Sequence, residues 1–493
     1  MGRGTFNVVN VMNSQKEPWM ASADSPSECT SFAVGRKHTA DGSWIYARSE
    51  DWHAMEAKRF EIYPSTSQGP ARFEALDSPF KCDLPAERLG YTALAPYNLP
   101  GHWGSAGFNA AGVGMSATES IFSNEKALAA DPFVAEGLAE NSVFNVVLPY
   151  IHSARGGAEY LGSLIEKYGT AESFGIGFID SKEVWYLESA GGHRWMAARI
   201  PDDKYFVTGN QGRLRDYDPN DKKNYLGAAD LIDFAVKNGL WDGTAEKFDF
   251  HEAYMREAPL DHTYNYPRVW GIQGMLSPDI KNDVTKNTFP VYARAEHDIT
   301  LDDVRRVFRF HYNGTEHDSY LNCNPKEEYR PVSIFRTTQT HILQVRPELP
   351  AAIGCVNYVC QGMAALGVFL PLYQGIQSFP KPYTVANGHS SADSAYWIFR
   401  RPQTLAMTNF NRYAKLVQDT YARLEHENDA RMRELEGQYL KIYKSQPYAA
   451  QEMLQAFSDA VLLRALEVTN TLVEELYSRM ALDIHTEYNF HGA

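Results

Sequence analysis

The chain has 493 residues, of which 44% are hydrophobic and 13% aromatic, and its formal net charge is −14. This length and composition are ample for a large hydrophobic core. The length also exceeds what one core normally supports, so we expect one main domain with a helical extension. The negative charge argues against a nucleic-acid partner, because clustered lysines and arginines are what bind phosphates. No apolar run is long enough for a transmembrane helix, so we expect no membrane partner, and the lack of a convincing signal peptide leads us to expect a cytoplasmic protein.

The first 28 residues are polar and contain Pro18 and Pro26. The stretch at residues 6–12 is too short and too polar for the apolar region of a secretory signal peptide. We therefore interpret residues 1–28 as a pro-segment or a flexible tail. Met20 is an alternative start of translation, which would shorten this segment.

Residues 29–51 predict a β-hairpin. One strand-like run, at residues 32–34, precedes an Asp-Gly turn signal at residues 41–42, and a second run, at residues 44–46, follows it. Asp-Gly between two such runs is typical of a hairpin, although this loop is longer than the tightest type. In an antiparallel pair, the end of the second strand returns to the start of the first.

This pairing predicts that Cys29 lies near Arg48 and Asp51. A nearby cation lowers the pKa of a thiol, which attacks only as the thiolate. If Cys29 were the first residue, its α-amine, with a pKa near about 7.7–8.0, could take the thiol proton. The alternative is a buried cysteine beside an ordinary ion pair, and these residues alone leave both interpretations open.

Residues 52–103 are rich in aromatic residues, proline and glycine, which indicates loops and short strands. Their aromatic side chains form either a pocket wall or ordinary packing. Residues 104–118 predict a pair of strands with small residues around Asn109 and Gly112, where backbone or ligand can approach closely.

Two helices and then a sheet follow. Apolar residues recur at helical spacing over residues 141–151 and 158–168. Residues 174–210 contain four strand-like runs with short connectors, which predicts an antiparallel meander. Helix pairs beside antiparallel strands indicate an α+β fold.

The remainder of the chain is predicted to be mainly helical. The predicted elements are helices at residues 221–237 and 302–311, a strand at 330–345, a buried run at 365–373, and long helices at 405–432 and 449–480. In the two long helices, apolar side chains recur every three or four residues. These helices either pack on the domain or form an oligomer interface, and the sequence does not choose between the two.

The five cysteines indicate neither a disulfide framework nor a metal site. Their number is odd and their spacing matches no zinc motif, so we interpret Cys82, Cys323, Cys355 and Cys360 as buried thiols. Histidines and aspartates gather between residues 297 and 318, but without a recognisable metal-binding motif. We therefore expect no metal and no cofactor.

Three short motifs carry a resemblance to a known family. Cys-Thr-Ser at residues 29–31, Asp-Gly-Ser at 41–43 and Ala-Arg-Ser-Glu-Asp at 47–51 resemble the opening of the C69 dipeptidases. These enzymes are N-terminal-nucleophile hydrolases, distantly similar to penicillin V acylase, bile-salt hydrolase and the secernins. Over roughly residues 29–400 the likeness continues in further stretches, at residues 108–119, 183–213, 264–273 and 336–342.

The resemblance implies a four-layer αββα sandwich at residues 29–400, followed by a helical extension at residues 401–493 that packs on it. It also implies a dipeptidase whose N-terminal cysteine is exposed by removal of residues 1–28. Hydrolysis of acylated amines and a non-catalytic, exocytosis-related role like that of secernins remain as alternatives. Dipeptide substrates are the expected partners, and formation of a homo-oligomer stays open.

The resemblance implies a role for each residue of the predicted hairpin site. Cys29 would be the nucleophile and, through its α-amine, the base. Arg48 would lie beside the thiolate. Asp51 would bind either the Cys29 ammonium or the amino group of the substrate.

Three more site residues come from later stretches. Asn109 and Asn210 would be polar donors near the oxyanion, where a preorganised donor contributes about 10²–10³ in rate. Arg268 would complete the charged lining. Without the resemblance, each asparagine would be interpreted as a turn or sheet-edge residue, and Arg268 as part of a surface ion pair.

Overall fold

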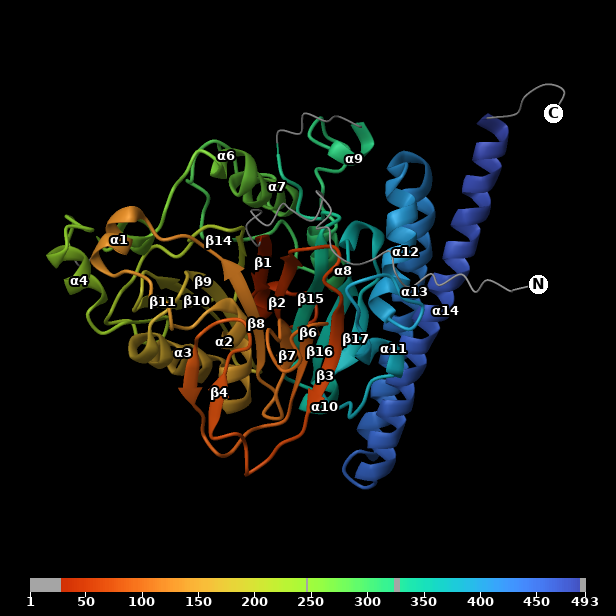
Figure 1. Ribbon diagram of the computed structural model, residues 1–493, viewed down its shortest axis with the longest axis horizontal. Helices are drawn as coiled ribbons and strands as arrows, with labels where there is room; N and C mark the ends of the chain where they lie inside the picture. Colours follow the sequence, from red (N-terminus) through yellow and green to blue (C-terminus); the bar gives the residue numbers. More distant parts are fainter. Residues whose placement is uncertain (1–27, 245–246, 323–328, 488–493) are drawn as a thin grey trace, which may run out of the picture.

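The computed structural model of the protein describes residues 28–244, 247–322 and 329–487. Most of the predicted pro-segment, residues 1–27, and Cys323 lie outside these ranges. Two antiparallel sheets lie face to face, with helices on both outer sides (Figure 1). The predicted α+β class with antiparallel sheets is therefore confirmed.

The larger sheet has seven strands in the order β14-β12-β1-β2-β15-β16-β17. Its strands are β1 (Glu28–Val34), β2 (Trp44–Asp51), β12 (Tyr205–Thr208), β14 (Tyr292–Ala293), β15 (Thr337–Val345), β16 (Cys355–Gln361) and β17 (Leu370–Tyr373). The predicted hairpin is the pair β1 and β2 at the centre of this sheet. Every residue of β2 is buried, because both faces of the strand are covered.

The smaller sheet has six strands in the order β13-β11-β10-β9-β8-β7. Its strands are β7 (Ala106–Phe108), β8 (Gly114–Ser120), β9 (Phe174–Ile179), β10 (Val184–Ala190), β11 (Arg194–Arg199) and β13 (Tyr225–Gly227). Two two-stranded antiparallel sheets lie outside both, β3 (Lys58–Tyr63) with β6 (Tyr91–Pro96) and β4 (Arg72–Glu74) with β5 (Lys81–Asp83). The predicted meander is correct for β9 to β11, but its fourth strand, β12, leaves this sheet and pairs with β1.

The two faces of the central hairpin have different surroundings. Phe32 belongs to the core between the larger sheet and the outer helices, whereas Ala33 and Tyr46 belong to the core that includes the smaller sheet. Side chains alternate along a strand, so Cys29 and Arg48 point toward the smaller sheet together with Ala33 and Tyr46. The alternation therefore places these two polar side chains between the sheets.

Helices cover the outer face of each sheet. The smaller sheet carries α2 (Glu140–Val147) and α3 (Ala154–Tyr168), and the larger sheet carries α7 (Tyr266–Leu276), α8 (Leu301–Phe308), α12 (Ala395–Met407), α13 (Phe410–Ile442) and α14 (Pro447–Glu487). The shorter helices are α1 (Glu125–Ala130), α4 (Leu231–Lys237), α5 (Phe250–Tyr254), α6 (Asp261–Tyr264), α9 (Ser319–Asn322), α10 (Ala351–Gly354) and α11 (Lys381–Thr384). Figure 1 shows α13 and α14 side by side along one edge of the molecule. Among the described helices, none combines the length and the apolar composition that crossing a bilayer requires.

The helix predicted at residues 221–237 begins only at Leu231. The carboxylate of Asp221 accepts hydrogen bonds from the backbone N–H and the side-chain amide of Asn224, at 3.3 and 2.7 Å. Short polar side chains that bond the nearby backbone in this way compete with helix formation. The residues before Leu231 therefore form a turn and the short strand β13.

Two further predicted elements have different bounds. The strand predicted at residues 330–345 begins at Thr337, where Arg400 of α12 donates to the carbonyl oxygen at 2.7 Å. The helix predicted at residues 405–432 is divided between α12 and α13 at Thr408. The Thr408 hydroxyl donates to a carbonyl oxygen of the preceding turn at 2.7 Å. At Thr408 a side chain thus bonds a backbone carbonyl oxygen that a continuous helix would have used itself.

Candidate active site

Cys29 and Arg48 lie in direct contact on the central hairpin. In the register of β1 and β2, Ser31 is opposite Arg48 and Cys29 is opposite Glu50, so Cys29 and Arg48 are diagonal neighbours. Arg48 Nη1 donates to Cys29 Sγ at 3.0 Å. Both side chains are only 2% exposed. The predicted contact between the thiol and the guanidinium is thus present in the structure.

Strand β8 of the smaller sheet fixes the Arg48 guanidinium. Nη2 donates to the carbonyl oxygen of Ala117 at 2.5 Å, Nη1 to that of Thr118 at 2.8 Å, and Nε to Ser116 Oγ at 3.3 Å. These bonds satisfy the fork of donors without neutralising its charge, since two acceptors are carbonyls and one is a hydroxyl. The positive charge therefore remains directed at Sγ.

The surroundings of Cys29 both raise and lower the pKa of its thiol. Burial raises the pKa of Cys29 well above its ordinary value, Arg48 lowers it, and the carboxyl groups of Glu119 and Asp51 raise it further. Burial disfavours a charged thiolate, and a cation in contact favours it. A base that removes the thiol proton during the reaction is therefore needed in addition to Arg48.

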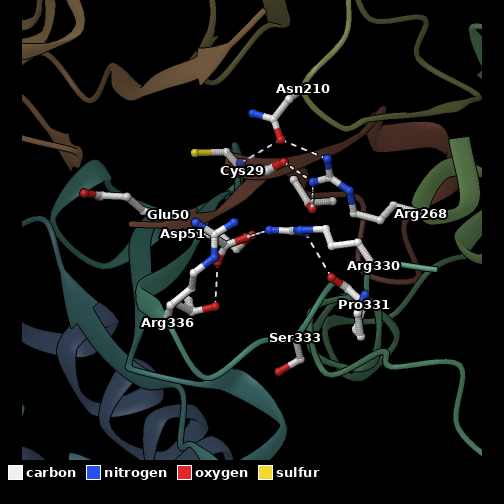
Figure 2. A network of polar contacts seen from close by, with 12 residues as sticks. Cys29, Glu50, Asp51, Asn210, Arg268, Arg330, Pro331, Ser333 and Arg336 are labelled. Carbon is white, nitrogen blue, oxygen red and sulfur yellow. Dashed lines mark hydrogen bonds and ion pairs between the residues drawn. The ribbon is translucent and has the colours of Figure 1, made fainter. Parts of the chain in front are cut away.

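Asn210 and Arg268 hold the main chain of Cys29 (Figure 2). Cys29 N donates to Asn210 Oδ1 at 3.0 Å, and Arg268 Nη2 donates to the same oxygen at 2.8 Å. Arg268 Nη1 donates to the carbonyl oxygen of Cys29 and, at 2.9 Å, to Thr30 Oγ1. The prediction placed Asn210 near the oxyanion as a donor, whereas the structure brings it to Cys29 through its acceptor oxygen.

The loop that carries Asn210 is fixed on both sides. Because β12 pairs with β1, the chain passes Cys29 as it leaves the sheet. Asn265 Oδ1 accepts the Asn210 N–H at 3.0 Å, and Asn210 Nδ2 donates to the Ser120 carbonyl oxygen at 3.0 Å. Further along the loop, the buried Glu188 carboxylate accepts two backbone N–H groups, from Arg213 at 2.7 Å and from Leu214 at 3.2 Å.

Asp51 lies near Cys29 but already has a cation of its own. Figure 2 shows its carboxylate directed toward Arg330, whose Nη2 donates to Asp51 Oδ2 at 2.5 Å. Thr337 Oγ1 donates to Oδ1, also at 2.5 Å. Asp51 comes three residues after Arg48 in the same strand, so its side chain points to the opposite face. Arg330 thus already gives Asp51 a counter-ion, and the role of Asp51 as the group that binds an ammonium ion stays a prediction.

Asn109 is not brought to Cys29. It lies at the turn between β7 and β8, at the opposite end of β8 from Thr118. Its Nδ2 donates to the carbonyl oxygens of Leu148 and Ile151, both at 2.8 Å, and its Oδ1 accepts two N–H groups of its own turn. The prediction that Asn109 is an oxyanion donor is therefore corrected, because its Nδ2 donates to the carbonyl oxygens of Leu148 and Ile151.

A pocket opens beside Cys29. It is lined by Cys29, Arg48, Glu50, Asp51, Trp52, Glu56, Lys58, Trp103, Thr118 and Glu140. Trp52 and Trp103 both line the pocket with their rings 6.4 Å apart, which favours the pocket wall of the two alternatives left open for the aromatic segment. The residues that sequence reasoning missed include Lys58, Thr118 and Glu140. Glu140 had no signal of its own, since an acid in the first turn is ordinary for a helix.

Within the described part of the chain, no group of three or more His, Cys, Asp or Glu side chains is arranged to hold a metal ion. The histidines of the 297–318 region bond separate acids, His311 with Asp318 at 2.9 Å and His297 with Asp303 at 3.1 Å. The cysteines at positions 82, 355 and 360 are buried and free, as predicted.

Comparison with known proteins identifies the family. The profile of peptidase family C69 matches residues 28–423. A probable dipeptidase of Salmonella dublin is 46% identical over 389 residues, which cover 76% of this chain and 90% of that protein. Dipeptidase A of Lactobacillus helveticus is 32% identical over 476 residues, which cover 92% of this chain and 98% of the relative.

Among solved structures, a mutant of conjugated bile acid hydrolase from Clostridium perfringens matches with 12% identity and a TM-score of 0.32. The match covers 74% of this chain and 98% of that one. This structural likeness is too low to carry an argument, whereas the sequence matches are extensive. With its matched residues 28–423 and a relative that is 46% identical, the chain belongs to peptidase family C69.

Proposed function

We propose that this C69 peptidase hydrolyses the peptide bond of dipeptides through a thioester on Cys29. The observation that carries the proposal is the 3.0 Å contact between Arg48 Nη1 and Cys29 Sγ, in a pocket that both residues line. The names of the relatives, probable dipeptidase and dipeptidase A, supply the substrate class. A buried thiol in contact with an arginine is suited to nucleophilic attack once a base removes its proton.

The base in this proposal is the α-amine of Cys29, freed when the bond between Glu28 and Cys29 is cut. Asn210 Oδ1, which accepts the Cys29 N–H at 3.0 Å, would hold this amine beside Sγ. A free α-amine has a pKa near about 7.7–8.0, so it is a competent base near neutral pH. This accounts for the position of Asn210 and Arg268 around the main chain of Cys29.

The reaction then has two steps. The amine takes the thiol proton, and the thiolate of Cys29 forms a bond with the carbonyl carbon of the substrate. The resulting ammonium returns the proton to the leaving nitrogen, the C–N bond breaks and the second amino acid leaves. Water attacks the thioester, the C–S bond breaks, and the first amino acid leaves with Cys29 restored as a thiol. Arg48 stabilises the sulfur anion each time it forms.

Cys29 would also remove residues 1–28. Its thiol attacks the carbonyl carbon of Glu28, the bond to Cys29 N breaks, and water hydrolyses the thioester to free the Glu28 carboxylate. We assign residues 29–400 to the catalytic domain and residues 401–493 to a helical extension. The order of helices, sheet, sheet and helices supports assigning this domain to the four-layer αββα N-terminal-nucleophile hydrolases.

The experiment is intact-mass analysis and dipeptide hydrolysis, compared between wild type, Cys29→Ala and the control Cys360→Ala. We expect wild type and the control to lose residues 1–28 and hydrolyse dipeptides, and Cys29→Ala to do neither. Active wild type with residues 1–28 still attached would exclude the α-amine as base. Loss of the segment from Cys29→Ala would exclude self-processing. Hydrolysis of acylated amines in place of dipeptides would favour the acylase alternative, and hydrolysis of neither a non-catalytic role.

A further inference from the structure

Glu140 places a carboxyl group in the pocket of Cys29. It is in the first turn of α2, it is 7% exposed, and it lines the pocket together with Cys29 and Thr118. Ser120 Oγ donates to Glu140 Oε1 at 2.5 Å. Within the described residues, no lysine, arginine or histidine forms an ion pair with this carboxyl group.

Two of the other three acids that line the pocket, Glu50 and Asp51, form ion pairs. Lys58 Nζ is in contact with Glu50, and Arg48 lies 3.7 Å from the same carboxylate. Burial disfavours the charged form of Glu50, but these two cations outweigh burial, so its pKa is lowered. Arg330 pairs with Asp51. Glu56 forms no ion pair with the described residues and burial raises its pKa, which the charge of Lys58 opposes, but it is less buried than Glu140.

Glu119 is a second buried acid without an ion pair among the described residues, but it does not line the pocket. Its side chain is fully buried, and Ser31 Oγ donates to its Oε2 at 2.7 Å. Of the four acids that line the pocket, Glu50 and Asp51 form ion pairs within the described part of the chain, whereas Glu56 and Glu140 form none there, and Glu140 is the more buried of these two.

A buried carboxylate without a cation is costly, because burial removes water and nothing replaces it. Burial, together with the charge of Glu172, raises the pKa of Glu140 to about 8. Glu172 Oε1 accepts the Glu140 backbone N–H at 2.8 Å, so this second acid is fixed nearby. The nearby Thr118 hydroxyl acts to lower the pKa of Glu140. Among the described residues, this hydroxyl has no hydrogen-bond partner of ordinary geometry. A cation that entered the pocket would relieve this cost.

We propose that Glu140 binds the α-ammonium group of the substrate, so that the enzyme requires a free amino terminus. The inference rests on the proposed function, because the reacting carbonyl must reach Cys29 Sγ. In a dipeptide, one carbon separates the α-ammonium from that carbonyl, so the group that binds it must line the same pocket as Cys29. Glu140 meets this condition, and its missing counter-ion is the charge that the ammonium brings. An N-acylated substrate lacks this charge.

The first test compares Glu140→Gln with wild type on Ala-Ala and on N-acetyl-Ala-Ala. We expect kcat/KM for Ala-Ala to fall about 10²-fold, mainly through KM, because truncating one partner of a buried charge pair has an effect of this order. The rate on the acetylated substrate should not fall. Glu140→Asp, which keeps the charge, should retain most of the preference. The matched control is Glu56→Gln, which removes another lining carboxyl and should keep the preference. A Glu140→Gln variant with the full wild-type preference for Ala-Ala would overturn the proposal.

The second test does not depend on peptide hydrolysis. Wild type and Glu140→Gln are treated with 2-bromoethylammonium, a cation, or with iodoacetamide, a neutral reagent, and alkylation of Cys29 is followed by mass spectrometry. In each reaction the thiolate forms an S–C bond and the halide leaves. We expect the ratio of cation to neutral rates to fall at least about tenfold in Glu140→Gln, with an unchanged iodoacetamide rate showing an intact pocket. An unchanged ratio excludes Glu140 as the ammonium site. If wild type hydrolyses no dipeptide, the proposed function fails, while this ratio still decides the role of Glu140.

Discussion

Arg48 reaches Cys29 diagonally across the β1–β2 pair, with Nη1 at 3.0 Å from Sγ. Diagonal neighbours on one face of an antiparallel pair are about 7–8 Å apart at Cα, within reach of a long side chain. The strands alone therefore place the cation at the thiol, and the carbonyl oxygens of β8 fix its orientation.

Replacing Arg48 with alanine should raise the thiol pKa and lower kcat/KM by about 10²-fold or more, because the sulfur anion loses its cation. The rate of Cys29 alkylation by iodoacetamide, measured against pH, reports the thiol pKa directly and should shift to higher pH. Arg36→Ala is the matched control, since Arg36 pairs with the exposed Glu348 on the surface. Unchanged kinetics together with an unchanged pH profile would remove Arg48 from the reaction.

The contact between Cys29 and Arg48 could be predicted from the sequence because a hairpin fixes which strand ends meet. The same pattern also bears on the side-chain direction of Asp51. Asp51 is three residues from Arg48, an odd separation, and odd separations in a strand place side chains on opposite faces. Its carboxylate accordingly pairs with Arg330, which comes from a distant part of the chain.

Other parts of the site depend on packing between segments that no local pattern connects. Glu140 reaches the pocket because α2 packs on β8, and its sequence signal is that of an ordinary helix start. Asn210 reaches Cys29 because β12 leaves the predicted meander for the other sheet. Asn109 was misplaced because a buried asparagine can serve a turn as well as a site, and only the positions of Leu148 and Ile151 decide which.

The two asparagines should differ in what their loss affects. Asn109→Ala leaves buried carbonyl oxygens and backbone N–H groups without partners, so the free energy of unfolding should fall by about 1–3 kcal/mol. Its kcat/KM, measured on folded protein, should stay close to wild type. Asn210→Ala should lower kcat/KM by about 10²-fold, because Cys29 N loses its acceptor and Arg268 one of its partners.

Urea unfolding and dipeptide kinetics on both variants check this difference. An Asn109→Ala variant as inactive as Asn210→Ala would contradict it and return Asn109 to the site.

Activity should survive treatment with a chelator. The proposed reaction uses only the thiol and amine of Cys29, the charge of Arg48 and water, so no step requires a metal. Dialysis against EDTA should leave kcat/KM for a dipeptide unchanged, whereas iodoacetamide should abolish it. Loss of activity with EDTA and its recovery with Zn²⁺ would count against the thiol mechanism.

The last prediction concerns Glu188, the buried acid that anchors the loop after Asn210. Burial raises the pKa of Glu188 from 4.5 to about 7, although two backbone N–H bonds oppose the rise. Between pH 4.5 and about 7, Glu188 is protonated in the folded protein but ionised in the unfolded chain. Stability therefore falls as pH rises through this window, and the contribution of Glu188 is fully present only below it.

Replacing Glu188 with glutamine removes this titration, so the difference in unfolding free energy between wild type and Glu188→Gln isolates it. Other acids with raised pKa values, such as Glu119 and Glu140, are present in both proteins and cancel. From about pH 4.5 to 7, wild type should lose stability relative to the variant by up to about 1.4 kcal/mol per pH unit. Urea unfolding at four or more pH values across the window measures this slope. A difference that stays constant with pH would show that Glu188 titrates normally, and that its two backbone hydrogen bonds offset the whole cost of its burial.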